Sequence, residues 1–193
     1  MLNVVVKNTE RFLLSVPKTK RKKYGQFFTN MSTAKFMASL FCFDHSKPCL
    51  EILDAGAGTG ILATAVIQKL IDDGYKGRIH VTCYETDDFV MPVLEENMRL
   101  STVLPNVTCS IKTDNYITSQ NFSNYTHFGG EDFHYDYIIG NPPYLKTPKD
   151  AVEALAMPEV CYGAPNLYFL FWAMGIHNLK EGQELVYIIP RSW

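Results

Sequence analysis

Four consecutive residues, Asn141-Pro142-Pro143-Tyr144, combine a polar amide, a stiff backbone and an aromatic ring. They follow an apolar run that ends in Gly140, so we expect them at the carboxyl end of a strand that the two prolines terminate. The Asn141 amide oxygen and the Pro142 carbonyl can accept both hydrogens of one exocyclic amino group, while the Tyr144 ring stacks on the plane that carries it. The stretch indicates a pocket for a flat base with an amino group. The alternative is a rigid turn whose asparagine caps the strand.

A glycine-rich turn is a second stretch with binding chemistry. The apolar run 50–54 ends in Asp54, the sequence Ala-Gly-Ala-Gly-Thr-Gly follows up to Gly60, and apolar residues at helical spacing begin at Ile61. Such a turn between strand and helix lets a ligand approach the backbone and presents free N–H groups at the helix start. The spacing is GxGxG and not the GxGxxG of dinucleotide binding, which disfavours a nicotinamide cofactor. An acid where a pyrophosphate would lie favours a ligand with a positive group.

Acidic residues also follow the next two predicted strands. Glu85 ends the alternating run 79–84, at the position that binds ribose hydroxyls in doubly wound folds. The sequence Asp-Asn-Tyr at 114–116 follows the run 107–111 and offers an acceptor and a ring for an adenine. The alternatives are an exposed carboxylate at a strand end and an ordinary loop start rich in Asp and Asn.

The elements that would position these residues alternate between strand and helix. The predicted strands are 50–54, 79–84, 107–111, 136–140 and 184–189. One predicted helix starts at Thr29 or Ser32 and ends near Phe43. Three others cover 61–70, 89–100 and 166–179, and the last of them closes at 180–182. This alternation predicts a parallel α/β sheet. We expect residues 1–17 to be a short lead-in with a β-rich start, and 117–134 and 146–165 to be polar segments, the second one near the substrate.

Composition describes an ordinary globular chain. Its 193 residues are 47% hydrophobic and 20% charged, without an apolar run of 18, so neither a membrane nor a secreted location is expected. Five cysteines without a CxxC pair argue for reduced thiols in the cytoplasm and against zinc. Five of the 18 basic residues lie between 18 and 23, which leaves 13 against 20 acidic residues elsewhere. A local basic patch is therefore expected, or simply a solvated segment, but no general nucleic-acid footprint.

Taken together, these motifs resemble the N6-adenine DNA methyltransferases of restriction–modification systems, most closely the Eco57I type. The resemblance spans nearly the whole chain in the family's order. Its pieces are KKYGQFFT (22–29), DAGAGTG (54–60), Glu85, the segment at Asp114, NPPY (141–144), Asn166-Leu167-Tyr168 and YIIPRSW (187–193). NPPY alone also occurs in methyltransferases that act on RNA or on a protein glutamine, and the two ends narrow the choice to DNA. The implied fold is a Rossmann-like methyltransferase sheet.

The resemblance implies S-adenosylmethionine as cofactor and no metal. The residues that it assigns to the cofactor are Gly25, Phe28 and Thr29 at its methionine part, Asp54, Gly56, Ala57, Gly58 and Gly60 beneath it, Glu85 at the ribose, and Asp114 with Asn115 at the adenine. Two positions depart from the family. Asn30 stands where proline is usual, and Asn115 where an aromatic residue is expected, for which Tyr116 can substitute.

The implied catalytic residues are those of the NPPY stretch, Asn141, Pro142, Pro143 and Tyr144. Adenine N6 is a poor nucleophile because its lone pair is delocalised. Acceptors at Asn141 and Pro142 would stabilise the positive charge that develops on this nitrogen, and no covalent enzyme intermediate is needed. The target adenine would be flipped out of double-stranded DNA, with Tyr144 stacking on it.

The resemblance also implies an organisation for the chain. We expect an N-terminal arm at 1–30 and a catalytic core at 31–193 that is truncated after the fifth of seven strands, with a specificity module or further domain beyond Trp193. The strand 184–189 would then be a sheet edge through which the chain self-associates. The alternatives are a cofactor-binding but inactive fragment or subunit, and a methyltransferase that acts on RNA or on a protein glutamine amide.

Overall fold

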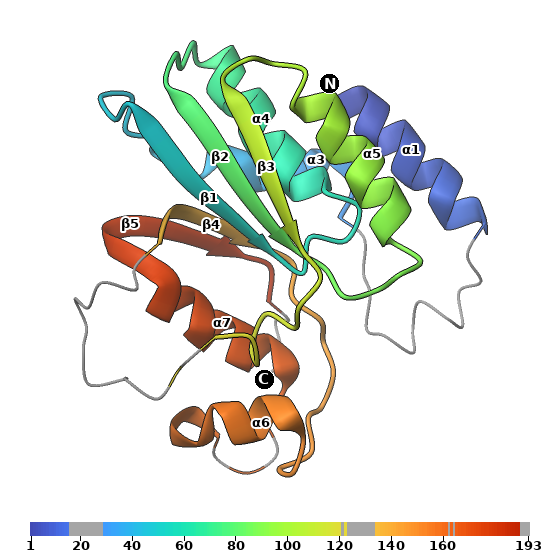
Figure 1. Ribbon diagram of the computed structural model, residues 1–193, viewed down its shortest axis with the longest axis vertical. Coiled ribbons are helices and arrows are strands. Elements are labelled where there is room, and N and C mark those ends of the chain that lie inside the picture. The colour runs from blue at the N-terminus through green and yellow to red at the C-terminus, as the bar shows by residue number, and fades with distance from the viewer. Residues whose placement is uncertain (16–28, 121, 123–133, 162, 164, 190–193) are drawn as a thin grey trace.

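A five-stranded sheet organises the protein. The computed structural model describes residues 1–15, 29–120, 122, 134–161, 163 and 165–189. The strands are β1 (Cys49–Ala55), β2 (Arg78–Tyr84), β3 (Val107–Lys112), β4 (Tyr135–Gly140) and β5 (Leu179–Tyr187), in the order β3-β2-β1-β4-β5 (Figure 1). All four pairings are parallel, which confirms the predicted α/β sheet. The carboxyl ends of the strands, which carry the predicted site, therefore meet along one rim.

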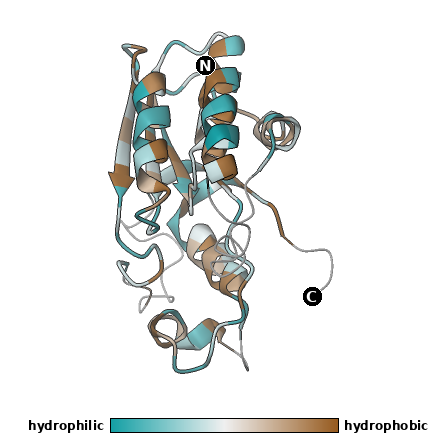
Figure 2. Ribbon diagram, turned by 90° about the vertical axis from the view of Figure 1, so that its right-hand side faces the viewer, coloured by the Kyte–Doolittle hydropathy of each residue, from teal (hydrophilic) through white to brown (hydrophobic). Residues whose placement is uncertain are grey.

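Helices cover both faces of this sheet. One face carries α1 (Leu2–Ser15), α3 (Met31–Ser39), α4 (Ile61–Asp72) and α5 (Met91–Ser101), and the other carries α7 (Leu167–Asn178) with the short α6 (Val152–Ala156) and the 3-10 turn η1 (Pro158–Val160) beyond it (Figure 1). Figure 2 shows hydrophobic and hydrophilic residues mixed on α1 and α5, whereas α7 is mostly hydrophobic. Two clusters of buried side chains, one on each side of the sheet, form the core. Among the helices that the structure describes, none is long and apolar enough to cross a membrane.

The prediction of a β-rich lead-in at residues 1–17 is wrong. Residues 2–15 form the helix α1, which packs against α4 and α5. Its buried residues are Leu2, Val5 and Thr9, which recur at helical spacing. The three consecutive valines at 4–6 suggest a strand, but this burial outweighs their local preference. The described part of the predicted arm 1–30 is thus packed on the core.

Several predicted boundaries also need correction. Asn30 caps α3, and not Thr29 or Ser32, because its side-chain oxygen accepts a hydrogen bond from the Thr33 amide at 2.9 Å. This helix ends at Ser39 and not at Phe43. The helix α7 does not close at 180–182, because β5 begins directly at Leu179. The polar segment 146–165 contains α6 and η1, and it buries Ala154 and Met157.

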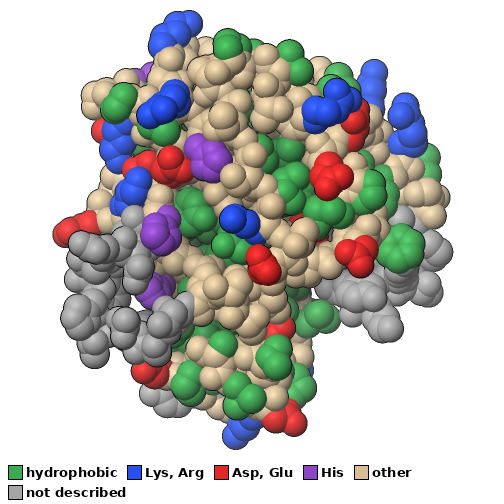
Figure 3. Space-filling view, in the orientation of Figure 1, with side chains coloured by type: hydrophobic (Ala, Val, Ile, Leu, Met, Phe, Trp, Pro, Cys, Tyr) green, Lys and Arg blue, Asp and Glu red, His purple; other side chains and the backbone are tan. Residues whose placement is uncertain are grey.

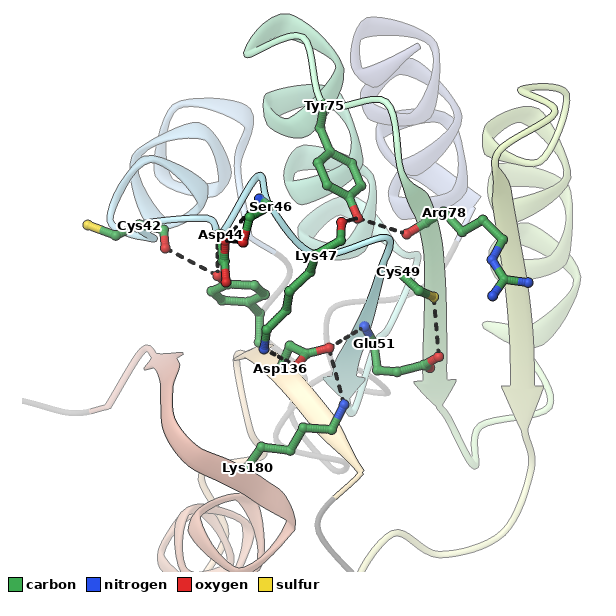
Figure 4. Close-up of polar contacts among 11 residues, drawn as sticks. Cys42, Asp44, Ser46, Lys47, Cys49, Glu51, Tyr75, Arg78, Asp136 and Lys180 are labelled. Carbon is green, nitrogen blue, oxygen red and sulfur yellow. Dashed lines mark hydrogen bonds and ion pairs between the residues drawn. The ribbon is translucent and has the colours of Figure 1, made fainter.

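One carboxylate makes contacts that connect three strands near their amino ends, at the end of the sheet opposite the predicted site. Asp136, at the start of β4, is almost fully buried and accepts a hydrogen bond from the Glu51 amide of β1 at 2.8 Å. Figure 4 shows the side chains of Lys47 and Lys180 pointing toward it, at 2.7 and 3.3 Å. Lys180 belongs to β5, so this one side chain joins β1, β4 and β5.

Candidate active site

A cavity of about 430 Å³ lies at the carboxyl rim of the sheet. It is lined by the glycine-rich turn after β1, the ends of β2 and β3, the start of the NPPY stretch after β4, and α7. Nine of the residues predicted for the site line it: Thr29, Gly56, Ala57, Gly58, Glu85, Asp114, Asn115, Asn141 and Pro143. Residues that are up to 114 positions apart in the sequence, such as Thr29 and Pro143, are thus brought to one site. Gly25 and Phe28 lie outside the described residues.

The glycine-rich turn has a backbone that only glycine adopts easily. Gly56, Gly58 and Gly60 have φ values of 70°, 56° and 79°. Gly56 and Gly58 line the cavity. Gly60 does not line it. A Cβ atom there would lie 2.8 Å from the Met98 side chain, so this glycine permits close packing of the turn against α5.

Two carboxylates accept hydrogen bonds from backbone amides of the turn and of the helix that follows it. Glu85 accepts a hydrogen bond from the Gly58 amide at 2.9 Å, and its other oxygen accepts from the amides of Thr86 and Asp87 at 2.8 Å each. The Ala63 amide in the first turn of α4 donates to Asp54 at 3.0 Å. Free amides here would bind a phosphate. Because acidic side chains already accept from them, the turn is not built for a pyrophosphate, in agreement with its GxGxG spacing.

Asp54 lies beneath the turn and not in the cavity wall. It is fully buried, and its Oδ1 atom has no hydrogen-bond partner among the described residues. Burial raises the pKa of this carboxyl to about 7, although the bond from the Ala63 amide opposes the rise. The Tyr187 hydroxyl is a second buried oxygen without a hydrogen-bond partner among the described residues. Its pKa is raised mainly by burial and also by the Asp54 charge. Asp54 thus provides negative potential beneath the turn only where it is ionised, above a pKa of about 7.

Asn141 is held at both ends of its amide. The nitrogen lies 3.2 Å from the Thr29 hydroxyl, and the oxygen accepts from the Tyr144 hydroxyl at 2.7 Å. The Tyr144 hydroxyl also lies 2.9 Å from the Ile188 carbonyl, so its single proton is shared between an acceptor in the NPPY stretch and one just after β5. Burial raises the pKa of Tyr144 to about 12, so this phenol remains a donor. Pro142 is buried and, like Tyr144, does not line the cavity.

Part of the cavity wall is aromatic. Tyr116 lines the cavity and is almost fully buried, with its ring centroid 5.1 Å from that of Tyr84 and 5.3 Å from that of Phe171. Tyr116, which was expected to substitute for the aromatic residue missing at 115, is thus an aromatic residue of this wall. Sequence reasoning missed Phe171, because an aromatic residue on the apolar helix α7 reads as ordinary core.

Asn115 connects this wall to α6. Its amide nitrogen donates to Glu153 at 2.8 Å, and its oxygen accepts from the Ile117 amide at 2.9 Å. Glu153 itself lines the cavity, although the sequence analysis did not single it out. Its only sequence signal is its place in the segment 146–165, which was predicted to lie near the substrate.

The cavity is acidic. Glu85, Asp87, Asp88, Asp114 and Glu153 line it, and none of its lining residues in the described part of the chain is Lys, Arg or His. Burial raises the pKa of Glu85, and hydrogen bonds from three backbone amides oppose this. Among the described residues, no group of three His, Cys, Asp or Glu side chains could hold a metal ion. Such a wall attracts an organic cation and repels phosphates.

The parallel sheet with helices on both faces is the Rossmann-like α/β fold found in structures of S-adenosylmethionine-dependent methyltransferases. A crystal structure from Listeria monocytogenes, of a protein assigned to the class I S-adenosylmethionine-dependent methyltransferases, superposes with a TM-score of 0.65 at 22% identity, over 87% of this chain and 48% of that one. At this identity the likeness shows the fold alone. Residues 30–193 match the Eco57I restriction-modification methylase family, to which the chain belongs.

Two type II methyltransferases are similar to the chain. M.PstI of Providencia stuartii is 33% identical over 200 aligned residues, which cover 100% of this chain and 38% of that protein. M.BsuBI of Bacillus subtilis is 30% identical over 176 residues, which cover 90% of this chain and 35% of that protein. The chain thus spans little more than a third of the length of these relatives.

Proposed function

We propose that this chain binds S-adenosylmethionine and transfers its methyl group to the N6 amino group of adenine in DNA, within a restriction–modification system. The observation that carries the proposal is that Asn141 lines the same cavity as the glycine-rich turn and Glu85. An amide that can accept from an amino group and a surface suited to a cofactor are therefore adjacent. Family membership and the names of the type II relatives support DNA as the substrate.

The described residues fit this cofactor in charge. S-adenosylmethionine carries a sulfonium and an ammonium group against one carboxylate, so its net charge is positive. The five carboxylates of the wall and the buried Asp54 suit such a ligand. We propose that Gly56, Ala57 and Gly58 lie under it and that Thr29 approaches its methionine part.

Two further cavity walls would hold the nucleoside part of the cofactor. Glu85 uses three of about four acceptor positions on backbone amides and retains acceptor capacity for a ribose hydroxyl. Asp114 and the Tyr116 ring would hold the adenine. When bound, the cofactor supplies an electrophilic methyl group.

The chain's own residues supply orientation and electrostatics. Asn141 and the Pro142 carbonyl would accept the two N6 hydrogens of the target adenine and stabilise the positive charge that develops on this nitrogen. Thr29 and Tyr144 hold the Asn141 amide in a fixed orientation, so little reorganisation is needed. The adenine would have to leave the DNA duplex to reach Asn141.

The test is a tritium-transfer assay with labelled S-adenosylmethionine, offered with duplex DNA, RNA and a glutamine-bearing protein. We expect label in DNA, recovered as N6-methyladenine after digestion to nucleosides, and a loss of at least about a hundredfold in Asn141→Ala. Label in RNA or in the glutamine protein alone would overturn the assignment of DNA. Binding of the cofactor without transfer to any substrate would instead indicate a subunit that requires a further module.

A further inference from the structure

The N-terminal helix α1 contacts the glycine-rich turn through one buried pair of hydroxyls. Thr9 of α1 and Thr59 of the turn are each 2% exposed, and their Oγ1 atoms lie 2.8 Å apart. Thr9 Oγ1 also lies 2.9 Å from the Val5 carbonyl within the helix. Each hydroxyl has one proton, so the consistent arrangement has Thr59 donating to Thr9 and Thr9 donating to Val5. The turn is thus connected to the backbone of α1.

A second contact from α1 reaches the backbone of the same residue. The fully buried Asn97 of α5 donates from its side chain to the Thr59 carbonyl at 2.8 Å. The oxygen of the Asn97 amide accepts from the Asn8 side chain of α1 at 2.9 Å. Thr59 is therefore held at its side chain and at its carbonyl, and both sets of hydrogen bonds connect it to α1.

These hydrogen bonds hold the glycine-rich turn, whose glycines leave its backbone more conformational freedom than other residues would. Thr59 lies between Gly58 and Gly60, both with positive φ, and it lines the cavity itself. Glycine loses more conformational freedom on folding than any other residue, so this turn is held in one shape only by what surrounds it. Buried hydrogen bonds to the one non-glycine residue between the last two glycines would fix that shape.

We propose that α1 is a brace for the cofactor turn and that Thr9 is a positioning residue for cofactor binding. The proposal rests on the proposed function, because it assumes that the turn holds S-adenosylmethionine. The helix lies outside residues 30–193, which match the family, so the family match assigns it no role. Thr9 does not touch the cavity and acts only through Thr59.

The first test uses the full chain without ligand. Amide hydrogen exchange is compared between the wild type, Thr9→Val, Thr9→Ser and Ile79→Val. We expect the turn 56–60 to exchange several times faster in Thr9→Val and at the wild-type rate in Thr9→Ser, which keeps the hydroxyl. Ile79→Val is the matched control, because it removes one methylene from a buried residue at the amino end of β2 and leaves the turn intact.

The second test measures the Kd of S-adenosylmethionine for the same variants. Loss of one net hydrogen bond predicts about a fivefold weaker Kd for Thr9→Val, and an unchanged Kd for Thr9→Ser and Ile79→Val. If Thr9→Val does not fold, Asn8→Ala removes the other support from a half-buried position. Equal exchange and equal Kd in wild type and Thr9→Val would overturn the brace. Absence of binding in the wild type would overturn the proposed function, whereas the exchange comparison would still decide on the brace.

Discussion

Burial in the folded protein disfavours the ionised form of Asp54. The pKa of this carboxyl rises from 3.8 to about 7 on folding, mainly because of burial. Between these values the folded chain holds a proton that the unfolded chain has lost, so stability falls as pH rises from about 4 to about 7. A shift of this size corresponds to at most about 4 kcal/mol.

We therefore expect Asp54→Asn to gain stability relative to the wild type across this pH range. The variant keeps an acceptor for the Ala63 amide but has no charge to bury. Urea unfolding from pH 4 to pH 8 measures the difference, which should increase with pH and then level off. Parallel stability profiles of variant and wild type would show that Asp54 is not titrating in this range.

Tyr144 combines two roles that substitution can separate. Its hydroxyl bonds to the Asn141 oxygen, and its ring is the predicted stacking surface for the target base. We expect Tyr144→Phe to reduce methyl transfer about fivefold with DNA affinity retained, because one hydrogen bond is worth about 1 kcal/mol.

Tyr144→Ala removes the ring as well and should also weaken DNA binding, by about 1–3 kcal/mol. Transfer assays and fluorescence titration with duplex DNA measure the two effects. Transfer at the wild-type rate in Tyr144→Phe would mean that the hydroxyl does not position Asn141.

At the scale of elements, Asp136 holds together the starts of β1 and β4 and the start of β5 (Figure 4). Burial alone would raise the pKa of Asp136, but the Glu51 amide and the two lysines outweigh it and hold the pKa below its ordinary value. The resulting stability is present above the unfolded pKa of about 3.8 and is lost as pH falls through the lower, folded one.

Asp136→Asn should therefore lower the unfolding free energy by about 2 kcal/mol at neutral pH, and the loss should disappear at acid pH. Asp73→Asn is the control, since its ion pair with Lys69 is partly exposed and is worth less than about 1 kcal/mol. Denaturant unfolding at pH 7 and pH 3 provides the comparison. An equal effect of both substitutions would contradict a joining role for Asp136.

The sequence predicted those elements whose local pattern and buried packing agree. The strand ending in Asp54, its glycine turn and the helix from Ile61 were found because apolar period, turn residues and burial all point the same way. The helix α1 was missed because β-branched residues at 4–6 favour a strand, and only contacts with α4 and α5 decide for a helix. The roles of Glu153 and Thr9 were also missed, because they depend on contacts with Asn115 and Thr59, which are distant in sequence.

At the scale of the whole molecule, charge and apolar surface are unevenly distributed. Figure 3 shows Lys and Arg mainly over the upper half, while the lower lobe formed by α6 and α7 presents hydrophobic side chains. The basic run 18–23 and residues 190–193 lie outside the described residues. The strand β5 is an edge of the described sheet, and Ile189 just after it is 40% exposed.

We expect the chain to self-associate through β5, because an edge strand presents unpaired backbone groups. Sedimentation velocity over a range of concentrations should show association that Ile189→Lys reduces. The control is Leu14→Lys, which changes an exposed apolar residue of α1 far from that edge in the sequence. A chain that remains monomeric at all concentrations would contradict the expectation.

The central claim is that one cavity holds S-adenosylmethionine and presents Asn141 to a substrate that binds separately. Calorimetric titration of the wild type and Asn141→Ala with S-adenosylmethionine, without DNA, tests it most directly. We expect saturable binding at one site per chain, with Kd values for the two proteins within about threefold, since Asn141 is directed at the substrate. Absence of binding by the wild type, or its complete loss in Asn141→Ala, would contradict the account.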